Sequence, residues 1–331
     1  MTTDREINKI TESILIPGAG RSLEKFNLVR KATIDGGRIK LSIANTGLDD
    51  TAKEWLAEQL SQQLCKLPEV SNVTVEFVDT KPIELNRVRN IVAVMSGKGG
   101  VGKSLVTALL AIECNRRSMD VGILDADITG PTIPYMFGVS QRPAASEDGI
   151  FPVLSSSGIS IMSMNLVLPH EDDPVRWRGP VIAGTIREFW EHVIWGNLDL
   201  LLVDLPPGTS DAALTVIEKL PLSGTIIVST PQSLVGTIVR KSISLNKKMN
   251  IPILGLVENM SYLISDDDEK GNQLLGRSRG VELASAAGSS FLGQIPLDPE
   301  LARICDEGTI ESYGSPIIES LGRGLTEALK L

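Results

Sequence analysis

The stretch that decides the fold is Gly97-Lys98-Gly99-Gly100-Val101-Gly102-Lys103-Ser104. It satisfies the pattern G-x-x-x-x-G-K-[ST], whose glycine-rich backbone surrounds the phosphates of a nucleoside triphosphate. The apolar run 91–95 before it predicts a buried strand, and residues 105–113 after it predict a helix. A strand that turns through glycines into a helix directs backbone N–H groups and the positive end of the helix dipole at one point. We therefore predict that residues 97–104 bind phosphates, with Lys103 on the β- and γ-phosphates and Ser104 on Mg²⁺.

A second lysine, Lys98, lies inside this loop. Phosphate binding by the loop backbone does not need a cation at that position. The sequence K-G-G-V-G-K-S resembles the deviant P-loop of the dimeric ATPases that include MinD, ParA and the nitrogenase iron protein. That resemblance implies a homodimer in which Lys98 contacts the nucleotide bound by the partner subunit.

The composition predicts a protein with a full hydrophobic core. The chain has 331 residues, of which 42% are hydrophobic, so it can hold more than one domain. Its formal net charge of -9 argues against nucleic-acid binding. The sequence has no N-terminal apolar signal segment and no run of about 18 apolar residues, so we expect a cytoplasmic protein without membrane contact.

We predict two domains joined by a linker. Residues 1–80 form a small α+β domain, residues 81–89 form the linker, and residues 90–331 form the ATPase domain. The patterns of the small domain predict helices at Glu6–Ile14 and Thr51–Leu67 and strands at Gly37–Ala44 and Val70–Phe77. Those of the large domain predict strands at Val121–Leu124, Leu198–Val203, Thr225–Ser229 and Ile253–Val257, which alternate with helical stretches. This alternation predicts an α/β fold with a mostly parallel sheet flanked by helices on both faces.

Acidic residues follow two of these strands. Asp127 lies in a loop just after Asp125 and can orient or deprotonate the attacking water; alternatively, both aspartates cap the next helix or turn. Asp204 ends the apolar run 200–203 and has the form of a Walker B acid that holds Mg²⁺, although a core strand that ends in a polar residue has the same pattern. Gly208 follows at once and can offer an unhindered N–H to the γ-phosphate.

The order of seven motifs identifies a family. K-G-G-V-G-K-S, D-A-D-I-T-G-P-T, W-R-G-P, D-L-P-P-G-T, T-P-Q, E-N-M-S-Y and F-L-G-Q-I-P-L-D-P, within residues 90–315, resemble the Mrp/ApbC family of P-loop ATPases. Members of that family act as iron-sulfur cluster carriers or scaffolds. The first 80 residues resemble the small domain that is fused to many Mrp proteins and occurs alone in iron-sulfur assembly factors.

The resemblance implies roles for individual residues. It implies ATP and Mg²⁺ as ligands, Lys98 acting in trans, Asp127 supporting hydrolysis and the segment 204–208 sensing the γ-phosphate. It also implies that Asn259 and the loop around Pro296 contact the adenine. From the sequence alone, Asn259 can equally be a turn residue at the end of a strand.

The chain departs from the family at its cluster ligands. Family members that hold a cluster carry C-x-x-C shortly after N-M-S-Y, whereas here Ser265 and Asp268 occupy the two cysteine positions. Their oxygen atoms are hard ligands and poor substitutes for thiolates. The small domain has Thr46-Gly47-Leu48-Asp49-Asp50 where its relatives often carry a cysteine. We therefore identify no iron-sulfur ligands and regard a bound cluster as doubtful.

The remaining candidate ligands are few. Cys65, Cys114 and Cys305 are isolated in the sequence, so they predict neither a disulfide framework nor a metal cluster within one chain. We expect His170 and His192 to be surface or core residues. The acidic run 266–269 is expected to be a solvated loop rather than a divalent-ion site.

Three functional hypotheses follow. The first is an ATP-hydrolysing homodimer that acts with client or assembly proteins in iron-sulfur protein assembly. The second is a regulatory nucleotide switch that recruits a partner and holds no cluster. The third is a positioning ATPase like MinD, which would need an amphipathic, basic helix at the membrane. The charges of the tail 316–331 cancel, so we expect its apolar residues to pack on the domain instead.

Overall fold

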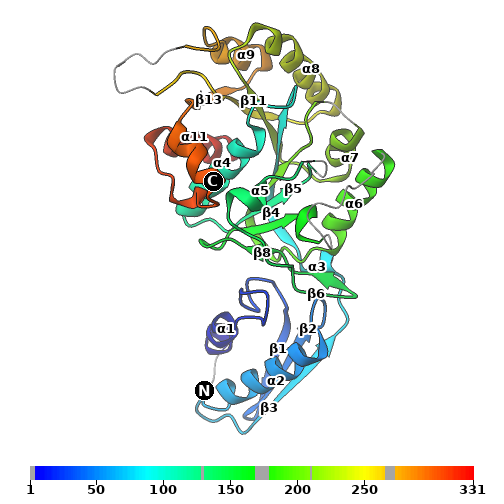
Figure 1. The fold of residues 1–331 in the computed structure, drawn as a ribbon. Helices are drawn as coiled ribbons and strands as arrows, with labels where there is room; N and C mark the ends of the chain where they lie inside the picture. Colours follow the sequence, from blue (N-terminus) through cyan, green and yellow to red (C-terminus); the bar gives the residue numbers. More distant parts are fainter. Residues whose placement is uncertain (1–3, 128–129, 168–178, 209–210, 265–272) are drawn as a thin grey trace. The chain divides into compact units, whose positions relative to one another are not determined.

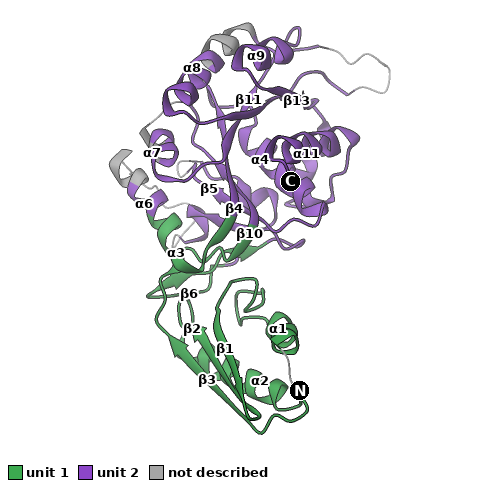
Figure 2. Ribbon diagram, turned by 180° about the vertical axis from the view of Figure 1, so that it is seen from behind, with its two compact units in different colours: residues 1–88, 142–154, 188–198 green, residues 89–141, 155–187, 199–331 purple. Residues whose placement is uncertain are grey.

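The computed structural model describes residues 4–127, 130–167, 179–208, 211–264 and 273–331. The chain divides into two compact units, which Figure 2 shows in different colours. Unit 1 comprises residues 1–88, 142–154 and 188–198, and unit 2 comprises residues 89–141, 155–187 and 199–331. Two segments that follow the P-loop in sequence therefore belong to the same unit as the N-terminal residues.

Unit 1 contains a small three-stranded sheet. Its N-terminal elements are α1 (Asp4–Ser13), β1 (Val29–Asp35), β2 (Arg38–Ala44), α2 (Asp50–Leu64), β3 (Asn72–Val78) and α3 (Pro82–Leu85) (Figure 1). Strand β2 pairs antiparallel with β1 and parallel with β3, the arrangement that a helical crossover through α2 permits. The Asp49 carboxylate caps α2 by accepting a hydrogen bond from the Ala52 N–H at 2.7 Å. The stretch 81–89, expected as a linker, contains α3.

The two later segments complete the core of unit 1. They carry the short strands β6 (Ala145–Ser146), β7 (Gly149–Ile150) and β8 (Val153–Leu154). The rings of Phe26 and Phe151 lie 4.7 Å apart at an interplanar angle of 53°. Gly47, with φ of +77°, leaves room for these contacts, because a Cβ there would lie 2.6 Å from Ile194 Cδ1. The loop 46–50 is therefore held against residues far away in sequence.

The large sheet has eight strands in the order β13-β12-β11-β4-β10-β5-β9-β8. Besides β8 they are β4 (Arg87–Ser96), β5 (Val121–Asp125), β9 (Ser160–Ser163), β10 (Asn197–Asp204), β11 (Gly224–Ser229), β12 (Ile253–Glu258) and β13 (Ser290–Gln294). Strand β5 pairs in parallel with β9 and β10, and β11 pairs in parallel with β4 and β12. Their carboxyl ends consequently meet at one edge, which is where ligands bind in open α/β sheets.

Helices cover both faces of this sheet, as predicted. In Figures 1 and 2, α4 and α11 lie on one side, and α7 and α8 lie on the other. The helices are α4 (Lys103–Arg116), α5 (Ile133–Met136), α6 (Gly179–His192), α7 (Asp211–Lys219), α8 (Ser233–Met249), α9 (Gly280–Ala287), α10 (Pro299–Asp306) and α11 (Pro316–Leu329). Helix α11 buries Ile318, Leu321 and Leu325 and packs against α4, which confirms the expectation for the tail. No helix among the described residues has the length and apolar character needed to cross a bilayer.

All ten predicted helices and strands occur, with ends within about four residues of those expected. The strands that were not predicted are β1, β6, β7, β8, β9 and β13. Strand β1 lies at an edge of its sheet and has mostly exposed residues, so it lacks the alternation of apolar residues that marks a strand. Strands β9 and β13 contain four and five residues, of which only two are apolar in each strand, so no apolar run marks them.

Candidate nucleotide-binding site

The P-loop joins the buried strand β4 to the N-terminus of α4. Gly100 and Gly102 have φ values of +76° and +75°, a left-handed conformation that glycine adopts without strain. A Cβ on Gly102 would lie 2.1 Å from the Asn259 Nδ2 atom, so only glycine fits there. The first N–H groups of α4 lack partners within the helix and are available to an anion.

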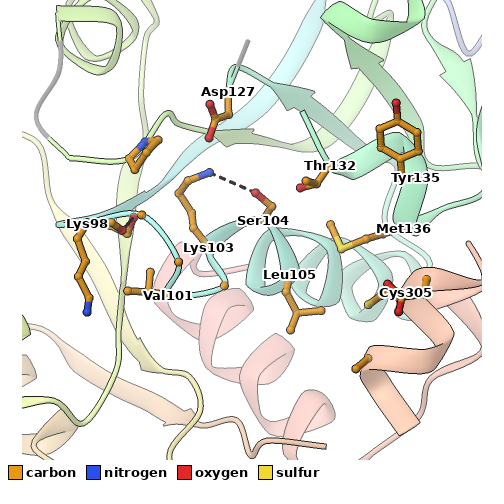
Figure 3. A pocket seen from close by; sticks show the side chains of 17 residues that line it. Lys98, Val101, Lys103, Ser104, Leu105, Asp127, Thr132, Tyr135, Met136 and Cys305 are labelled. Carbon is orange, nitrogen blue, oxygen red and sulfur yellow. Dashed lines mark hydrogen bonds between the residues drawn. The ribbon is translucent and has the colours of Figure 1, made fainter. Parts of the chain in front are cut away.

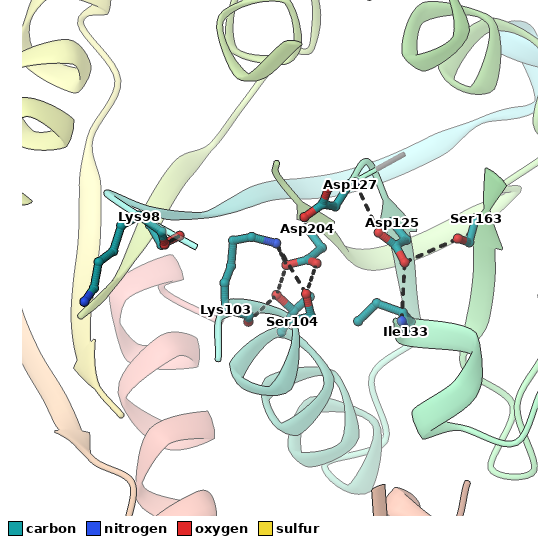
Figure 4. A network of polar contacts seen from close by, with 10 residues as sticks. Lys98, Lys103, Ser104, Asp125, Asp127, Ile133, Ser163 and Asp204 are labelled. Atoms are coloured by element: carbon teal, nitrogen blue, oxygen red, sulfur yellow. Dashed lines mark hydrogen bonds and ion pairs between the residues drawn. The ribbon is translucent and has the colours of Figure 1, made fainter. Parts of the chain in front are cut away.

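A cluster of polar side chains lies directly beneath this loop (Figure 4). Lys103 Nζ is 2.7 Å from Asp204 Oδ1, and the two side chains are 6% and 0% exposed. The Ser104 hydroxyl donates to Asp204 Oδ2 at 2.5 Å, and the Thr107 hydroxyl donates to Asp204 Oδ1 at 2.8 Å. The ion pair and the two hydroxyl donors offset the cost of burying the Asp204 carboxylate. The predicted phosphate-binding lysine and both predicted Mg²⁺ ligands therefore lie together.

Asp125 adds a second buried carboxyl group to this cluster. It lies opposite Asp204 in the register of β5 and β10 and is fully buried. Burial and the neighbouring Asp204 carboxylate raise the pKa of Asp125 to about 8, whereas Lys103 acts in the opposite direction. Lys103 and Asp204 balance each other's charge, whereas the Asp125 carboxyl group accepts hydrogen bonds from the Asp127 and Ile133 N–H groups. Sequence reasoning named Asp125 but did not place it against Asp204.

A cavity of about 620 Å³ opens above the P-loop (Figure 3). It is lined by the loop residues 98–104, by Asp127 and by Pro207 of the segment that follows β10. Asp127 thus faces the same space as Lys103 and Ser104, which is the position a water-orienting group needs. The volume falls within the range of roughly 300–1,000 Å³ that is usual for small-molecule sites.

The opposite wall of the cavity comes from two helices that sequence reasoning did not connect with the site. Helix α5 contributes Tyr135 and Met136, and α10 contributes Ala302, Cys305 and Asp306. No local motif marks these residues, since they come from segments far apart in the sequence that pack against each other.

We expect nucleotide binding to protect Cys305 from alkylation. Burial raises the pKa of the Cys305 thiol to about 11, so its reaction with iodoacetamide at pH 8 should be slow, and a ligand in the cavity should slow it further. Cys65 is exposed and lies in unit 1, so its alkylation should not respond to ATP. Mass spectrometry of the labelled peptides measures both rates, and equal Cys305 rates with and without saturating ATP would contradict the expectation.

Two predicted site residues make other contacts in this structure. Lys98 Nζ donates to Gln232 Oε1 at 2.7 Å, and its side chain points away from Lys103 (Figure 4). The Gly208 N–H donates to the Ser96 carbonyl at 3.0 Å. Lys98 would have to turn to reach a nucleotide, and Gly208 would have to exchange its partner.

The two predicted adenine contacts lie near each other but outside the lining of this cavity. Asn259 follows β12 and Pro296 follows β13, and the Ile295 N–H donates to the Glu258 carbonyl at 2.9 Å. The Asn259 side chain is 1% exposed, and its Nδ2 atom donates to the Val101 carbonyl at 2.9 Å. Asn259 thus supports the backbone of the P-loop through a hydrogen bond that the sequence did not predict.

The described residues offer few ligands for a metal ion or a cluster. Among the residues that the structure describes, no group of three or more His, Cys, Asp and Glu side chains could hold a metal ion. Cys114 is buried in α4, and burial raises its pKa to about 12, so the thiol is unreactive. His192 is exposed at the end of α6. Ser265, Asp268 and His170 lie outside the described residues.

One known protein family matches most of this chain. The profile of the ParA family, described as NUBPL iron-transfer P-loop NTPase, matches residues 87–323. The chain belongs to this family. An iron-sulfur cluster carrier protein of Methanocaldococcus jannaschii is 45% identical over 226 residues, covering 68% of this chain and 78% of that protein. A carrier protein of Synechocystis is 34% identical over 321 residues, covering 93% and 90%. The resemblance to the Mrp/ApbC carriers is thereby confirmed.

Solved structures agree with the assignment to the iron-transfer P-loop NTPases. A nucleotide-binding protein from Archaeoglobus fulgidus in complex with ADP has a TM-score of 0.64 and 42% identity, covering 72% of this chain and 95% of that chain. The cell division ATPase MinD of Pyrococcus furiosus has a TM-score of 0.53 at 20% identity, covering 73% and 98%. The second likeness concerns the fold alone.

Proposed function

We propose that this iron-transfer P-loop NTPase binds and hydrolyses ATP as a homodimer and acts in iron-sulfur protein assembly. The observation that carries the proposal is the buried cluster of Lys103, Ser104 and Asp204 at the start of α4, which opens onto the cavity above the P-loop. The family membership and the ADP complex of the relative from Archaeoglobus fulgidus support a nucleotide as the ligand.

Phosphate binding follows from the charges in the cluster. The N–H groups of residues 99–104 surround the phosphates, and Lys103 moves from the Asp204 carboxylate toward the β- and γ-phosphate oxygens. Ser104 and Asp204 then present a hydroxyl and a carboxylate oxygen, which are the ligand types that suit Mg²⁺. When bound, Mg²⁺ supplies charge neutralisation at the phosphate oxygens.

Hydrolysis requires residues that surround the terminal phosphate. Asp127 orients or deprotonates the attacking water, and the Gly208 N–H leaves the Ser96 carbonyl to contact the γ-phosphate. Lys98 releases Gln232 and stabilises the charge on the partner subunit's nucleotide. Asn259 and the loop around Pro296 contact the adenine once the Asn259 amide has left the Val101 carbonyl, which it contacts in this structure. ATP is favoured over GTP because no N-K-x-D sequence follows T-P-Q.

A second function is favoured by the missing thiols. Serine and aspartate occupy the family's cysteine positions, and the described residues contain no cluster of sulfur ligands. A nucleotide switch that recruits assembly partners but carries no cluster has the same P-loop chemistry. The two functions differ only in whether the chain holds iron and sulfide.

Iron and acid-labile sulfide per chain distinguish these functions. The full chain is purified and reconstituted without oxygen, and its metal content, visible absorption and ATP affinity are measured together. We expect ATP binding in every case. Stoichiometric iron and sulfide would show that the chain carries clusters through other ligands, and single replacements of the three cysteines by serine would then locate them. An iron-free, colourless protein that binds ATP would establish the switch.

A further inference from the structure

Glu258 is a fully buried carboxylate at the carboxyl end of β12 to which no role has been assigned. Its Oε1 atom accepts a hydrogen bond from the Arg279 N–H at 2.9 Å. Its Oε2 atom accepts from the Ser261 hydroxyl and from the Gln294 side-chain amide, each at 3.1 Å. All of these partners, within the described part of the chain, are neutral donors. A buried carboxylate without a counter-charge is costly, so its acceptor geometry indicates a specific positioning role.

The next residue connects Glu258 to the P-loop. Asn259 donates to the Val101 carbonyl at 2.9 Å and packs against Gly102. Met260 then adopts φ of +56°, a left-handed conformation that costs roughly 1–2 kcal/mol for a residue with a side chain. This left-handed turn lets the Ser261 hydroxyl reach the Glu258 carboxylate. The Asn259 side chain contacts the P-loop, whereas the Glu258 side chain contacts Arg279. Such strain persists because the contacts on both sides of Met260 hold it.

Arg279, the other end of this connection, is the N-cap residue that precedes α9. Its N–H donates to Glu258, its carbonyl accepts from the Leu283 N–H in the first helical turn, and its guanidinium pairs with Glu282 at 2.9 Å. The carboxylate of Glu258 therefore contacts the backbone at the residue that precedes α9.

A second connection reaches the same place from Lys98. Lys98 donates to Gln232 at 2.7 Å, and the neighbouring Pro231 lines a cavity of about 600 Å³ together with Arg279 and Val281. Val101 is thus connected to the residue before α9 through the adjacent side chains of Asn259 and Glu258, and the segment that Lys98 contacts lines the same cavity as Arg279. Val281 is 67% exposed at this position, so a displacement of α9 would change the surface of the protein.

We infer that Glu258 is a positioning residue that couples nucleotide occupancy of the P-loop to the start of α9. The inference rests on the proposed function, since it requires a ligand that draws the N–H groups of residues 99–104 onto its phosphates. The Val101 carbonyl moves with that backbone, the Asn259 amide follows it, and the Glu258 carboxylate shifts relative to the Arg279 N–H. Nucleotide binding then changes the position of α9, and the position of α9 changes the nucleotide affinity by the same coupling free energy.

The test is hydrogen exchange on the full chain, with and without a saturating non-hydrolysable ATP analogue. In the wild-type protein, we expect the analogue to change the exchange rates of the Arg279 and Leu283 amides by about tenfold, within the usual range of coupling energies. In Glu258→Gln, the amide has one acceptor oxygen and cannot accept from both sides. The expected change falls below about twofold there, while the analogue's affinity stays within about threefold of wild type.

A matched variant separates coupling from structural support. Ser261→Ala removes one donor from Oε2 but leaves the Arg279 contact intact, so it should keep the wild-type response. If Glu258 only stabilised the fold, Glu258→Gln would raise exchange equally with and without nucleotide, and that result would overturn the inference. If Glu258→Gln does not fold, the wild-type protein still decides, because the absence of a nucleotide effect at Arg279 and Leu283 refutes the coupling.

Calorimetry on the same samples separates a failure of the role of Glu258 from a failure of the proposed nucleotide binding. Binding of the analogue without any change at α9 would overturn the role of Glu258 and leave the proposed function standing. No binding at all would overturn the proposed function and the coupling together.

Discussion

Replacing Lys103 by alanine should abolish ATP binding. The lysine is the only residue of the cluster that brings a positive charge to the phosphates, and its Nζ atom lies 2.7 Å from Asp204. We expect the ATP dissociation constant to rise at least about 100-fold, or about 2.7 kcal/mol, when measured by isothermal titration calorimetry. The nucleotide-free protein should also lose about 3–5 kcal/mol of stability, because Asp204 is left buried without its counter-charge.

Lys103→Arg is the matched control for stability. It keeps the positive charge beside Asp204, so its thermal unfolding should stay closer to wild type, but the larger planar guanidinium does not fit the site of a point-like ammonium group and ATP binding should still weaken. Circular dichroism establishes that each variant is folded before its affinity is compared. Intact ATP affinity in Lys103→Ala would refute the assignment of the P-loop as the nucleotide site.

Replacing Asp127 by asparagine should remove hydrolysis while leaving binding intact. Asp127 lines the cavity beside Lys103 and Ser104, whose contacts to each other run through Asp204, so replacing Asp127 should leave the phosphate contacts in place. A residue that orients or deprotonates the attacking water contributes about 10²–10⁴-fold to the rate. We therefore expect phosphate release to fall at least about 100-fold, with ATP affinity within about threefold of wild type.

Asp306→Asn is the control, because Asp306 lines the same cavity from α10 and carries the same charge. It should hydrolyse ATP at a rate close to wild type, and wild-type turnover in Asp127→Asn would exclude Asp127 from the reaction.

The slow Asp127→Asn variant should also accumulate as a dimer with ATP in analytical ultracentrifugation. Adding Lys98→Ala should weaken that dimer if Lys98 acts on the partner subunit's nucleotide.

The residues with the clearest predictions were those whose partners are close in sequence. The P-loop needs only its own glycines, the strand before it and the helix after it, so its conformation could be predicted from residues 91–113 alone. Asp204 could be placed at the end of a buried strand because the run before it is apolar throughout. The contact between Asp204 and Asp125 could not be predicted, since it depends on β10 and β5 being neighbours in the sheet.

The missed features depend on contacts between distant segments. Residues 142–154 and 188–198 belong to the same unit as the N-terminal residues because Phe151 and Ile194 enter its core. Their local sequence pattern does not predict this packing. The cavity wall formed by Tyr135 and Cys305 arises where α5 meets α10.

The sequence by itself determined the parallel α/β class, the glycine-rich turn and the family, because apolar periodicity, a contiguous turn and short motifs are local features of the sequence. Only the tertiary structure decided that Lys98 rests on Gln232, that Asn259 braces Val101 and that Glu258 contacts the residue before α9. Each of these is a hydrogen bond between segments that the strand order brings together. A side chain's partner across a sheet depends on which strands become neighbours, and that is settled by the packing of the whole domain.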